Sequence, residues 1–315
     1  MLIISGWKFV FYDFRVSFFE SPLRLKKIST YHESIGDMVD EYLPIADHTY
    51  DRIYCSSLFT FTDKSWLPID GRWICGGTGF DIYSKLPKEI ESLRPKINVG
   101  FCSRGCIRNC KFCIVRKKEG YIREYADIYD IWDGQSRGIV LFDNNILALP
   151  QHFERICSQL VKEKLKVDFN QGLDIRLLDK ESASWLKKVS HKEHRFAFDS
   201  PKLAEIVVSK VAMLQTAGMK RSAWYVLIGC DTTLQEDLFR LNLLRDLKQN
   251  AYVMRYQKVD ASMPDSLINA SNEKIYTAIS RWANNHAWFH AATFEQFILR
   301  DENRKYLPFY KTFIV

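Results

Sequence analysis

The chain has 315 residues, and its 47% hydrophobic and 14% aromatic residues can bury the cores of about two domains. This composition excludes a disordered or low-complexity protein. Lys and Arg number 45 against 38 Asp and Glu, and the resulting net charge of +7 is too modest to indicate a nucleic-acid partner by itself.

An apolar stretch from Met1 to Phe14 opens the chain, but Lys8 and Asp13 interrupt it. The stretch lacks the positively charged start and the small-residue cleavage site of a signal peptide. We therefore expect a soluble, cytoplasmic protein with no membrane partner. The eight cysteines of such a chain stay reduced, so a tight cysteine cluster indicates metal binding or catalysis rather than a disulfide framework.

Residues 1–94 predict a small Rossmann-like α/β domain. A helical pattern covers residues 24–36, and strand-like runs follow at residues 52–59 and 72–77. A glycine-rich turn, Gly76 to Gly79, closes the second run. Such a turn is weak support for a phosphate or corrin site, because tight turns need glycine in any case.

Residues 95–268 alternate short β-rich runs with longer segments of helical period, the pattern of a parallel sheet wrapped by helices. The six predicted strands cover residues 97–101, 138–142, 166–170, 195–198, 224–229 and 251–256. Two of the predicted helices show a clear buried stripe, formed by Phe153, Ile156, Cys157, Leu160 and Val161 and by Leu203, Ile206, Val207, Val211 and Leu214. Six β/α units in sequence predict a (β/α)6 partial TIM barrel.

Local signals mark two helix starts within this region. Thr233 and Glu236 form a T-x-x-E capping box, and Ser200 followed by Pro201 offers an N-cap and a proline at the first helical position. The tail, residues 269–315, is helical and aromatic, and we expect it to cover one side of the barrel.

Chemistry is expected where the carboxyl ends of the barrel strands converge. A cysteine cluster follows the first predicted strand, and polar residues follow the next four, namely Asp143, Asn144, Asn145, Asn170, Gln171, Asp199, Cys230 and Asp231. Polar side chains gathered at one edge of an apolar sheet predict an active site there.

The cluster lies in the sequence GFCSRGCIRNCKFCIV, where Cys106, Cys110 and Cys113 form a C-x3-C-x2-C motif and Cys102 comes four residues earlier. Thiolates at this density hold either zinc or an iron-sulfur cluster. A structural zinc site favours two separated cysteine pairs, whereas here three thiols share one loop, with Phe112 directly before the last. Three ligands leave one iron of a four-iron cluster open, and an open metal position is typical of a catalytic site.

This motif, placed after the first strand of a (β/α)6 barrel, resembles the signature of the radical S-adenosylmethionine (radical SAM) enzymes. The resemblance implies that Cys106, Cys110 and Cys113 bind a [4Fe-4S] cluster, that S-adenosylmethionine chelates the fourth iron, and that Phe112 lies near the adenine. It also implies reductive cleavage of S-adenosylmethionine to methionine and a 5'-deoxyadenosyl radical, which takes a hydrogen atom from an unknown substrate. A flavodoxin or ferredoxin is the expected electron donor, and Cys102 is interpreted as a loop thiol.

The residues that position S-adenosylmethionine are less sharply marked. The family often has a Gly-Gly-Glu-like motif after the second strand, whereas this chain has FDNNIL, so Asp143, Asn144 and Asn145 are candidates to hold the methionine amino group. Asp199 and the turn at residues 228–231 are candidates for contacts to ribose and adenine. Helix capping by Asp231 is an equal alternative.

Further candidates follow the third predicted strand, which ends with Asn170 and Gln171. Arg176 is a candidate for the methionine carboxylate, because its planar guanidinium matches a carboxylate with two parallel hydrogen bonds. An Asp174–Arg176 pair that simply braces the loop is an equal alternative.

The α/β domain before the barrel is similar to the cobalamin-binding subgroup of these enzymes. The subgroup's D-x-H-x-x-G motif is absent, because Asp47 and His48 are not followed by it. We expect a degenerate domain without cobalamin, although some members of the subgroup bind cobalamin without this motif. Methylthiotransferases also place three cysteines in such a domain, but Cys55, Cys75 and Cys102 are poorly spaced for that role and no separate RNA-binding β-barrel follows.

Other reactive side chains have simpler interpretations. His286 and His290 lie four residues apart without the Glu of H-E-x-x-H, which favours a packing pair over a metal site. His191 and His194 are predicted in a charged, exposed turn, and Cys157 is predicted on the buried stripe of its helix.

The leading hypothesis is a radical SAM enzyme of unknown substrate. A metal-stabilised protein that binds nucleic acid through its basic runs and aromatic tail is the alternative outside the enzyme class. A methyltransferase or methylthiotransferase is the alternative within it. Strand alternation with polar strand ends favours an enzyme, because a binding module does not need such a barrel.

Overall fold

A computed structural model describes residues 8–13, 20–60 and 62–314. The chain divides into two compact units, Met1–Gly100 with Tyr129–Gln135, and Phe101–Ile128 with Ser136–Val315. The predicted domain boundaries at residues 94 and 268 stay predictions. The Met1–Phe14 stretch lies partly outside the described residues, and within those residues no helix is long and apolar enough to cross a membrane.

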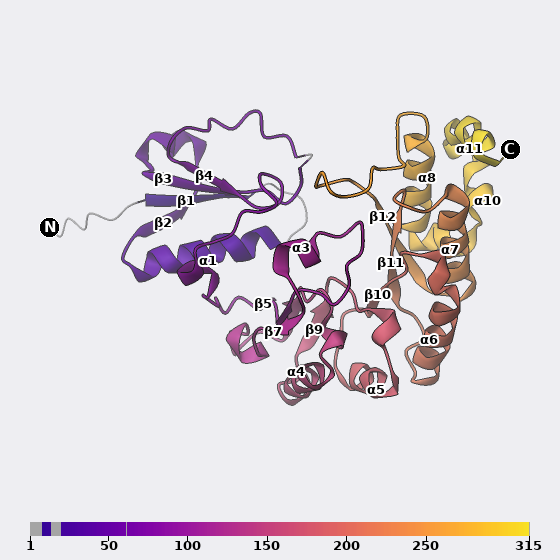
Figure 1. The fold of residues 1–315 in the computed structure, drawn as a ribbon, viewed down its shortest axis with the longest axis horizontal. Helices are drawn as coiled ribbons and strands as arrows, with labels where there is room; N and C mark the ends of the chain where they lie inside the picture. The colour runs from indigo at the N-terminus through magenta and orange to yellow at the C-terminus, as the bar shows by residue number, and fades with distance from the viewer. Residues whose placement is uncertain (1–7, 14–19, 61, 315) are drawn as a thin grey trace. The chain divides into compact units, whose positions relative to one another are not determined.

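The first unit contains a parallel four-stranded sheet in the order β2-β1-β3-β4 (Figure 1). Its strands are β1 (Lys8–Asp13), β2 (Met38–Glu41), β3 (Arg52–Ser56) and β4 (Trp73–Gly76). Helix α1 (Glu20–Ser34) connects β1 to β2, η1 (Pro44–Thr49) precedes β3, and α2 (Lys88–Glu91) and β5 (Val99–Gly100) follow β4. The predicted helix at residues 24–36 and both predicted strands of this region are confirmed.

The two faces of this sheet pack against different groups of residues, because neighbouring residues of a strand point to opposite sides. On β3, Ile53 and Cys55 join a core with Trp73. Tyr54 instead packs with Leu25 of α1 and other apolar residues. At the end of α1, the buried ring of His32 contacts the Tyr54 hydroxyl through Nε2 (3.0 Å) and Asp37 through Nδ1 (2.7 Å), which ties the helix to the sheet.

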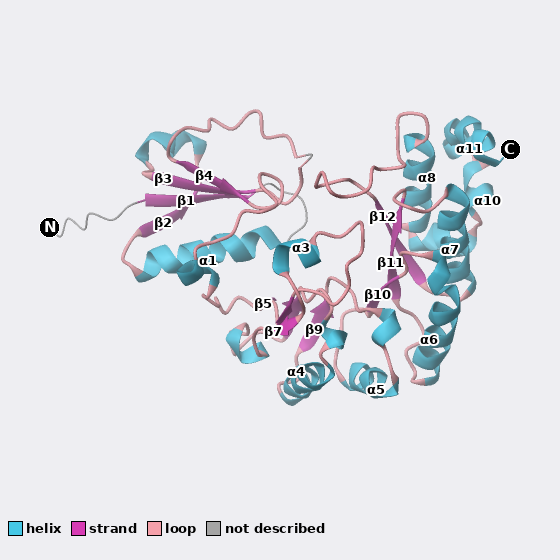
Figure 2. Ribbon diagram, viewed as in Figure 1, coloured by secondary structure: helices cyan, strands magenta, loops and turns pink. Residues whose placement is uncertain are grey.

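The second unit is a mixed α/β structure with parallel strands (Figure 2). Strand β8 (Gly138–Leu141) pairs with β9 (Lys166–Phe169), and β10 (Arg195–Ala197), β11 (Ala223–Ile228) and β12 (Asn250–Arg255) form a second parallel sheet. Helices α4 (Pro150–Lys162), α5 (Lys180–Lys188), α6 (Ala204–Thr216) and α7 (Leu234–Asp246) alternate with these strands. The six strands predicted for residues 95–268 are present, although the first of them, β5, spans only two residues and belongs to the first unit.

The described strands do not confirm the predicted (β/α)6 partial barrel. Between β9 and β10 there are only two isolated bridges, Val167 with His191 and Leu173 with Phe196. Strand β10 is three residues long, and each bridge includes a residue outside the two strands, so no continuous ladder joins the two sheets. The structure therefore supports a parallel α/β fold without a closed barrel.

The predicted helix faces are largely correct. Helix α4 buries Phe153, Ile156, Cys157 and Leu160, and α6 buries Val207, Val211 and Leu214. Two assignments are wrong, because Val161 and Ile206 are 39% and 36% exposed at the edges of these stripes.

The helix-start signals have different outcomes. The predicted capping box is present, with the Thr233 hydroxyl accepting from the Glu236 N–H (3.2 Å) and the Glu236 carboxylate from the Thr233 N–H (2.8 Å). Ser200 makes no capping bond with its side chain. Pro201 begins a short 3-10 turn, η5 (Pro201–Leu203), which leads into α6.

The aromatic tail packs against the second sheet, as expected. It contains α8 (Glu273–Ala283), α9 (His286–Ala291), α10 (Phe294–Ile298), η6 (Asp301–Tyr306) and α11 (Leu307–Ile314), and α8 lies along β12. The ring of Trp282 lies 5.0 Å from that of Phe289 and 5.4 Å from that of Phe294, and its indole N–H donates to the Ala292 carbonyl (3.0 Å).

His194 corrects one prediction, because it is buried rather than exposed. Its ring stacks on that of His191 with centroids 3.5 Å apart, and neither ring nitrogen has a hydrogen-bond partner within the described structure. Burial, with the nearby charge of His191, lowers the pKa of His194 to about 3. The protonated imidazole is therefore excluded from this position at neutral pH.

This burial predicts a pH-dependent stability. Between pH 6.5 and 3 the unfolded chain binds a proton at His194 that the folded chain does not, so the free energy of unfolding falls as the pH falls below about 6.5. The loss at pH 5 is about 2 kcal/mol. Urea denaturation at pH 7 and pH 5 should show that His194→Phe removes this loss, whereas His48→Gln, at an exposed position, keeps it. Equal pH dependence in wild type and His194→Phe would contradict the assignment.

Candidate functional site

A β-hairpin holds the cysteine loop at both ends. Strand β6 (Ser103–Arg104) pairs antiparallel with β7 (Arg123–Glu124), and residues 105–122 form the excursion between them. Within it, α3 (Val115–Glu119) follows the last cysteine of the motif. All three motif cysteines therefore come from one loop that is closed by backbone pairing.

The loop turns sharply at Gly105, directly before Cys106. Gly105 has φ +84, and a Cβ atom there would lie 2.7 Å from the Gly120 carbonyl oxygen and still closer to that of Tyr121. Its N–H donates to the Glu119 carboxylate (3.0 Å), which also accepts from the Asn144 side chain (3.2 Å). Only glycine fits this position, because both the left-handed φ and the close approach exclude a side chain.

Asp143 fixes the start of the loop from the end of β8. One of its oxygens accepts from the Cys102 N–H (3.2 Å), and the other accepts from both the N–H and the hydroxyl of Ser103. Burial raises the pKa of Asp143, although these hydrogen bonds oppose the rise. From α4, the buried His152 donates to the Cys102 carbonyl (2.8 Å), so the backbone before the motif is held on two sides.

The three motif cysteines are partly buried free thiols. Burial raises the pKa of Cys110, and it raises that of Cys113 to about 11; the charge of Cys106 adds to both shifts. The thiols therefore lie within electrostatic range of one another. Within the described residues, however, no three His, Cys, Asp or Glu side chains are arranged to hold a metal ion.

Asn145 connects the cysteine loop to the turn that follows β9. Its side-chain amide lies within hydrogen-bond range of the Cys106 sulfur (3.4 Å) and of the Asp174 carboxylate (3.4 Å). Its carbonyl oxygen Oδ1 is buried and has no partner within the described part of the chain. A buried acceptor of this kind is costly unless a ligand or water completes it.

Asp174 is the centre of an ionic network beside the cysteines. The guanidinium of Arg176 makes a two-pronged contact with it (2.6 and 3.0 Å), and Arg108, between Cys106 and Cys110, donates from Nε (2.9 Å). Burial by itself would raise the pKa of Asp174, but the two arginines outweigh burial and hold it below its ordinary value. The bracing pair predicted as an alternative for Arg176 is therefore present.

The remaining predicted residues lie at different depths. Asp199 accepts from the Leu227 N–H (3.1 Å), and its charge contributes to the raised pKa of Cys110 and Cys113. Asn170 offers its backbone carbonyl to the Tyr225 hydroxyl (2.7 Å), and Gln171 is exposed. Phe112 is half-buried in the cysteine loop.

In the turn after β11, the residue that caps the next helix is not the one offered as an alternative from the sequence. Thr233, and not the exposed Asp231, caps α7. Gly229 donates to the buried carboxylate of Asp237 (3.2 Å), which pairs with the fully buried Arg240. This ion pair is enclosed within the core under the turn.

The sequence interpretation missed Arg108 and Glu119. Arg108 is a basic residue between two candidate ligands, and that position is the only sequence signal of its role. Its partner Asp174 lies 66 residues away, so the contact itself could not be deduced.

Other reactive side chains take structural roles. His286 and His290 hydrogen-bond to Ala251 and Asn250 of β12, which supports a packing pair. Cys157 is fully buried, as predicted, and Cys230 is buried.

In the first unit, Cys55 and Cys75 are register partners on β3 and β4. Their thiols form a hydrogen bond, which lowers the pKa of Cys75.

No protein-family model matches the chain, and no curated protein matches it significantly. Among solved structures it is similar to SuiB of Streptococcus suis, at 10% identity and a TM-score of 0.44, over 58% of this chain and 45% of SuiB. For SuiB bound to S-adenosylmethionine the identity is 9% and the TM-score 0.43, over 58% of this chain and 46% of that one. The match spans less than half of SuiB, and at this level it assigns no activity to the chain.

The turn at Gly105 gives a direct test of the loop geometry. Gly105→Ala should displace the backbone at Cys106 and lower the iron content after anaerobic reconstitution at least about twofold, because the new methyl group collides with backbone rather than with a mobile side chain. Gly218→Ala is the matched control, since it has a similar φ of +91 but open space around the added Cβ. Equal iron contents in the two variants would show that the turn does not position the cysteines.

Proposed function

We propose that this chain is a radical SAM enzyme. The observation that carries the proposal is the set of three free thiols, Cys106, Cys110 and Cys113, on one hairpin-closed loop. A soft, three-thiolate donor set on so short a segment suits an iron-sulfur cluster with one open iron better than a closed zinc site.

The surroundings of the loop fit such a cluster. The Arg108 backbone N–H donates to the Cys106 sulfur (3.3 Å), and the Asn145 amide approaches the same atom. Hydrogen bonds to sulfur ligands of this kind tune the potential of a bound cluster. When bound and reduced, a [4Fe-4S] cluster supplies one electron that cleaves S-adenosylmethionine to methionine and a 5'-deoxyadenosyl radical.

Two residues are suited to hold the methionine end of S-adenosylmethionine. Asn145 Oδ1, which has no partner among the described residues, can accept from the ammonium group. Arg176 keeps guanidinium N–H groups for the carboxylate while Asp174 holds it in place. Asp143 is less suited to the ammonium, because both of its oxygens are used by the loop backbone and Ser103. Asp199 and Phe112 stay candidates for the nucleoside.

The reaction also needs an electron from outside the chain. We propose a low-potential protein donor, a flavodoxin or a ferredoxin, as the partner that reduces the cluster. No feature of the described residues favours cobalamin chemistry or nucleic-acid binding over this function.

The proposed chemistry is tested by 5'-deoxyadenosine formation. After anaerobic reconstitution with iron and sulfide and reduction with dithionite, the wild type should hold about four irons and form 5'-deoxyadenosine from S-adenosylmethionine. The C106A/C110A/C113A variant should lose both properties, whereas Cys157→Ala, which removes a buried thiol from α4, should keep both. A wild type that binds zinc in place of iron and forms no 5'-deoxyadenosine would refute the proposal.

The role of Arg176 is tested separately by binding. Arg176→Gln should raise the dissociation constant for S-adenosylmethionine about tenfold, the effect of losing one charge-assisted contact, with the iron content unchanged because Arg108 still pairs with Asp174. Arg72→Gln is the matched control, because Arg72 also pairs with carboxylates, those of Asp47 and Asp70, but in the first unit. If Arg176→Gln lost both its iron and its binding of S-adenosylmethionine, Arg176 would only brace the loop.

A further inference from the structure

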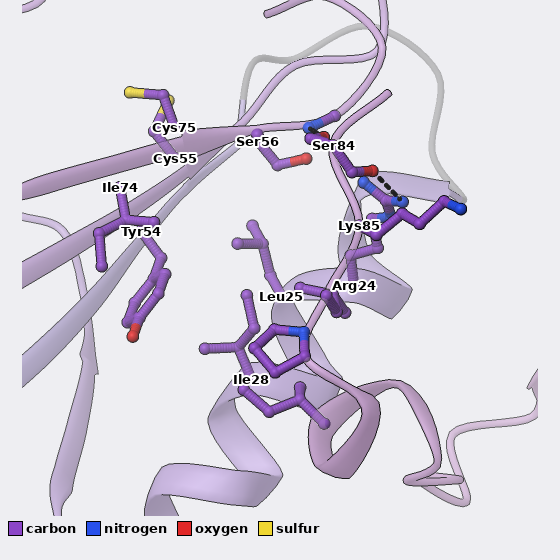
Figure 3. A pocket seen from close by; sticks show the side chains of 15 residues that line it. Arg24, Leu25, Ile28, Tyr54, Cys55, Ser56, Ile74, Cys75, Ser84 and Lys85 are labelled. Atoms are coloured by element: carbon purple, nitrogen blue, oxygen red, sulfur yellow. Dashed lines mark hydrogen bonds between the residues drawn. The ribbon is translucent and has the colours of Figure 1, made fainter. Parts of the chain in front are cut away.

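The first unit contains a cavity of about 230 Å³ that the proposed radical chemistry does not use (Figure 3). The sheet forms its floor at the carboxyl ends of β3 and β4, α1 forms one wall, and residues 84–90 form another. The direction in which strands are added to the sheet reverses at β1, because β2 pairs on one side of β1 and β3 pairs on the other. Open parallel sheets bind ligands outside the carboxyl ends of their strands, beside such a reversal.

The interior of the cavity is mainly apolar. Leu25 and Ile28 reach into it from α1, and Ile74 faces it from β4 (Figure 3). Ile74 is 44% exposed although it lies within a strand, so the floor offers apolar surface to a ligand. At about 30 Å³ for each water molecule, the cavity volume of about 230 Å³ corresponds to roughly eight water molecules. An organic group of about ten non-hydrogen atoms is of similar size.

One hydroxyl group also lies in the floor. Ser56 lines the cavity although only 4% of the residue is exposed. Its side chain lies on the same face of the sheet as Tyr54 and Ile74, whereas the sulfurs of Cys55 and Cys75 point to the opposite face (Figure 3). The hydroxyl can donate to, or accept from, a polar atom of a molecule within the cavity.

The charged groups that line the cavity among the described residues are basic. Arg24 and Lys85 line it, no acidic residue of the described part of the chain does, and Arg24 donates to the Ser84 carbonyl (3.2 Å) at the rim. The Ser84 hydroxyl in turn accepts from the Gly77 N–H (3.3 Å), which fixes the rim to the turn after β4. An apolar interior with two cations at its edge favours a ligand with an apolar body and one negative group.

We propose that this cavity binds a small organic anion, with an apolar body of about ten non-hydrogen atoms inside and a carboxylate or phosphate group at Arg24 and Lys85. The Ser56 hydroxyl would bond to a polar atom on the body of the ligand. The site goes beyond the proposed radical chemistry, since it uses none of the same residues.

The proposal is tested on the full chain with four probes of similar size. Benzoate and phenyl phosphate carry the anion, benzyl alcohol is neutral, and benzylammonium is a cation. Isothermal titration should show that at least one anion binds about tenfold more tightly than benzyl alcohol, and that benzylammonium binds most weakly. The tighter of the two anions identifies the head group.

Variants locate the binding and separate its parts. R24Q/K85Q should weaken anion binding about tenfold, whereas K26Q/K88Q, which removes the same charge from residues that do not line the cavity, should leave it unchanged. Ser56→Ala, which removes only the hydroxyl, should weaken binding of the best probe about threefold or more. The proposal is overturned if no probe binds at about 10 mM, if neutral and anionic probes bind equally, or if R24Q/K85Q binds as the wild type does.

Discussion

The buried carboxylate of Asp174 is the interaction on which the candidate site depends. It accepts from Arg108 in the cysteine loop and Arg176 in its own turn, and it lies within reach of Asn145 at the end of β8. Burying one carboxylate among two guanidinium groups is stable only while the charges remain paired, since an uncompensated buried charge costs several kcal/mol. The network therefore holds three segments, far apart in sequence, in one arrangement around the thiols.

The backbone of the loop is fixed by a second set of contacts that involve no thiol. Asp143 and His152 hold Cys102 and Ser103, Gly105 makes the turn, and Glu119 closes it. These contacts leave Cys106, Cys110 and Cys113 free for a cofactor. A functional constellation is best held in this way, by neighbours that do not themselves take part in the chemistry.

The sequence predicted the elements better than their assembly. Strands β8 to β12 fall within about one residue of their predicted bounds, because each is a short apolar run bounded by polar or glycine residues. The break between the two sheets was not deducible, because the pairing of β9 with β10 depends on the length of β10 and on a turn whose His194 is buried rather than exposed. The cysteine motif could be recognised because its three cysteines are close in sequence, whereas the contact of Arg108 with Asp174 joins distant segments. The cavity of the first unit could not be predicted for the same reason, because it combines α1, two strand ends and a loop.

The central claim, that three thiolates hold a four-iron cluster with one open iron, is tested most directly by electron paramagnetic resonance of the anaerobically reduced protein. The reduced protein should give the signal of a [4Fe-4S] cluster, and the shape of this signal should change when S-adenosylmethionine is added, because S-adenosylmethionine would bind the iron that lacks a cysteine ligand. A cluster signal that S-adenosylmethionine leaves unchanged, or a fully reconstituted protein without such a signal, would contradict it.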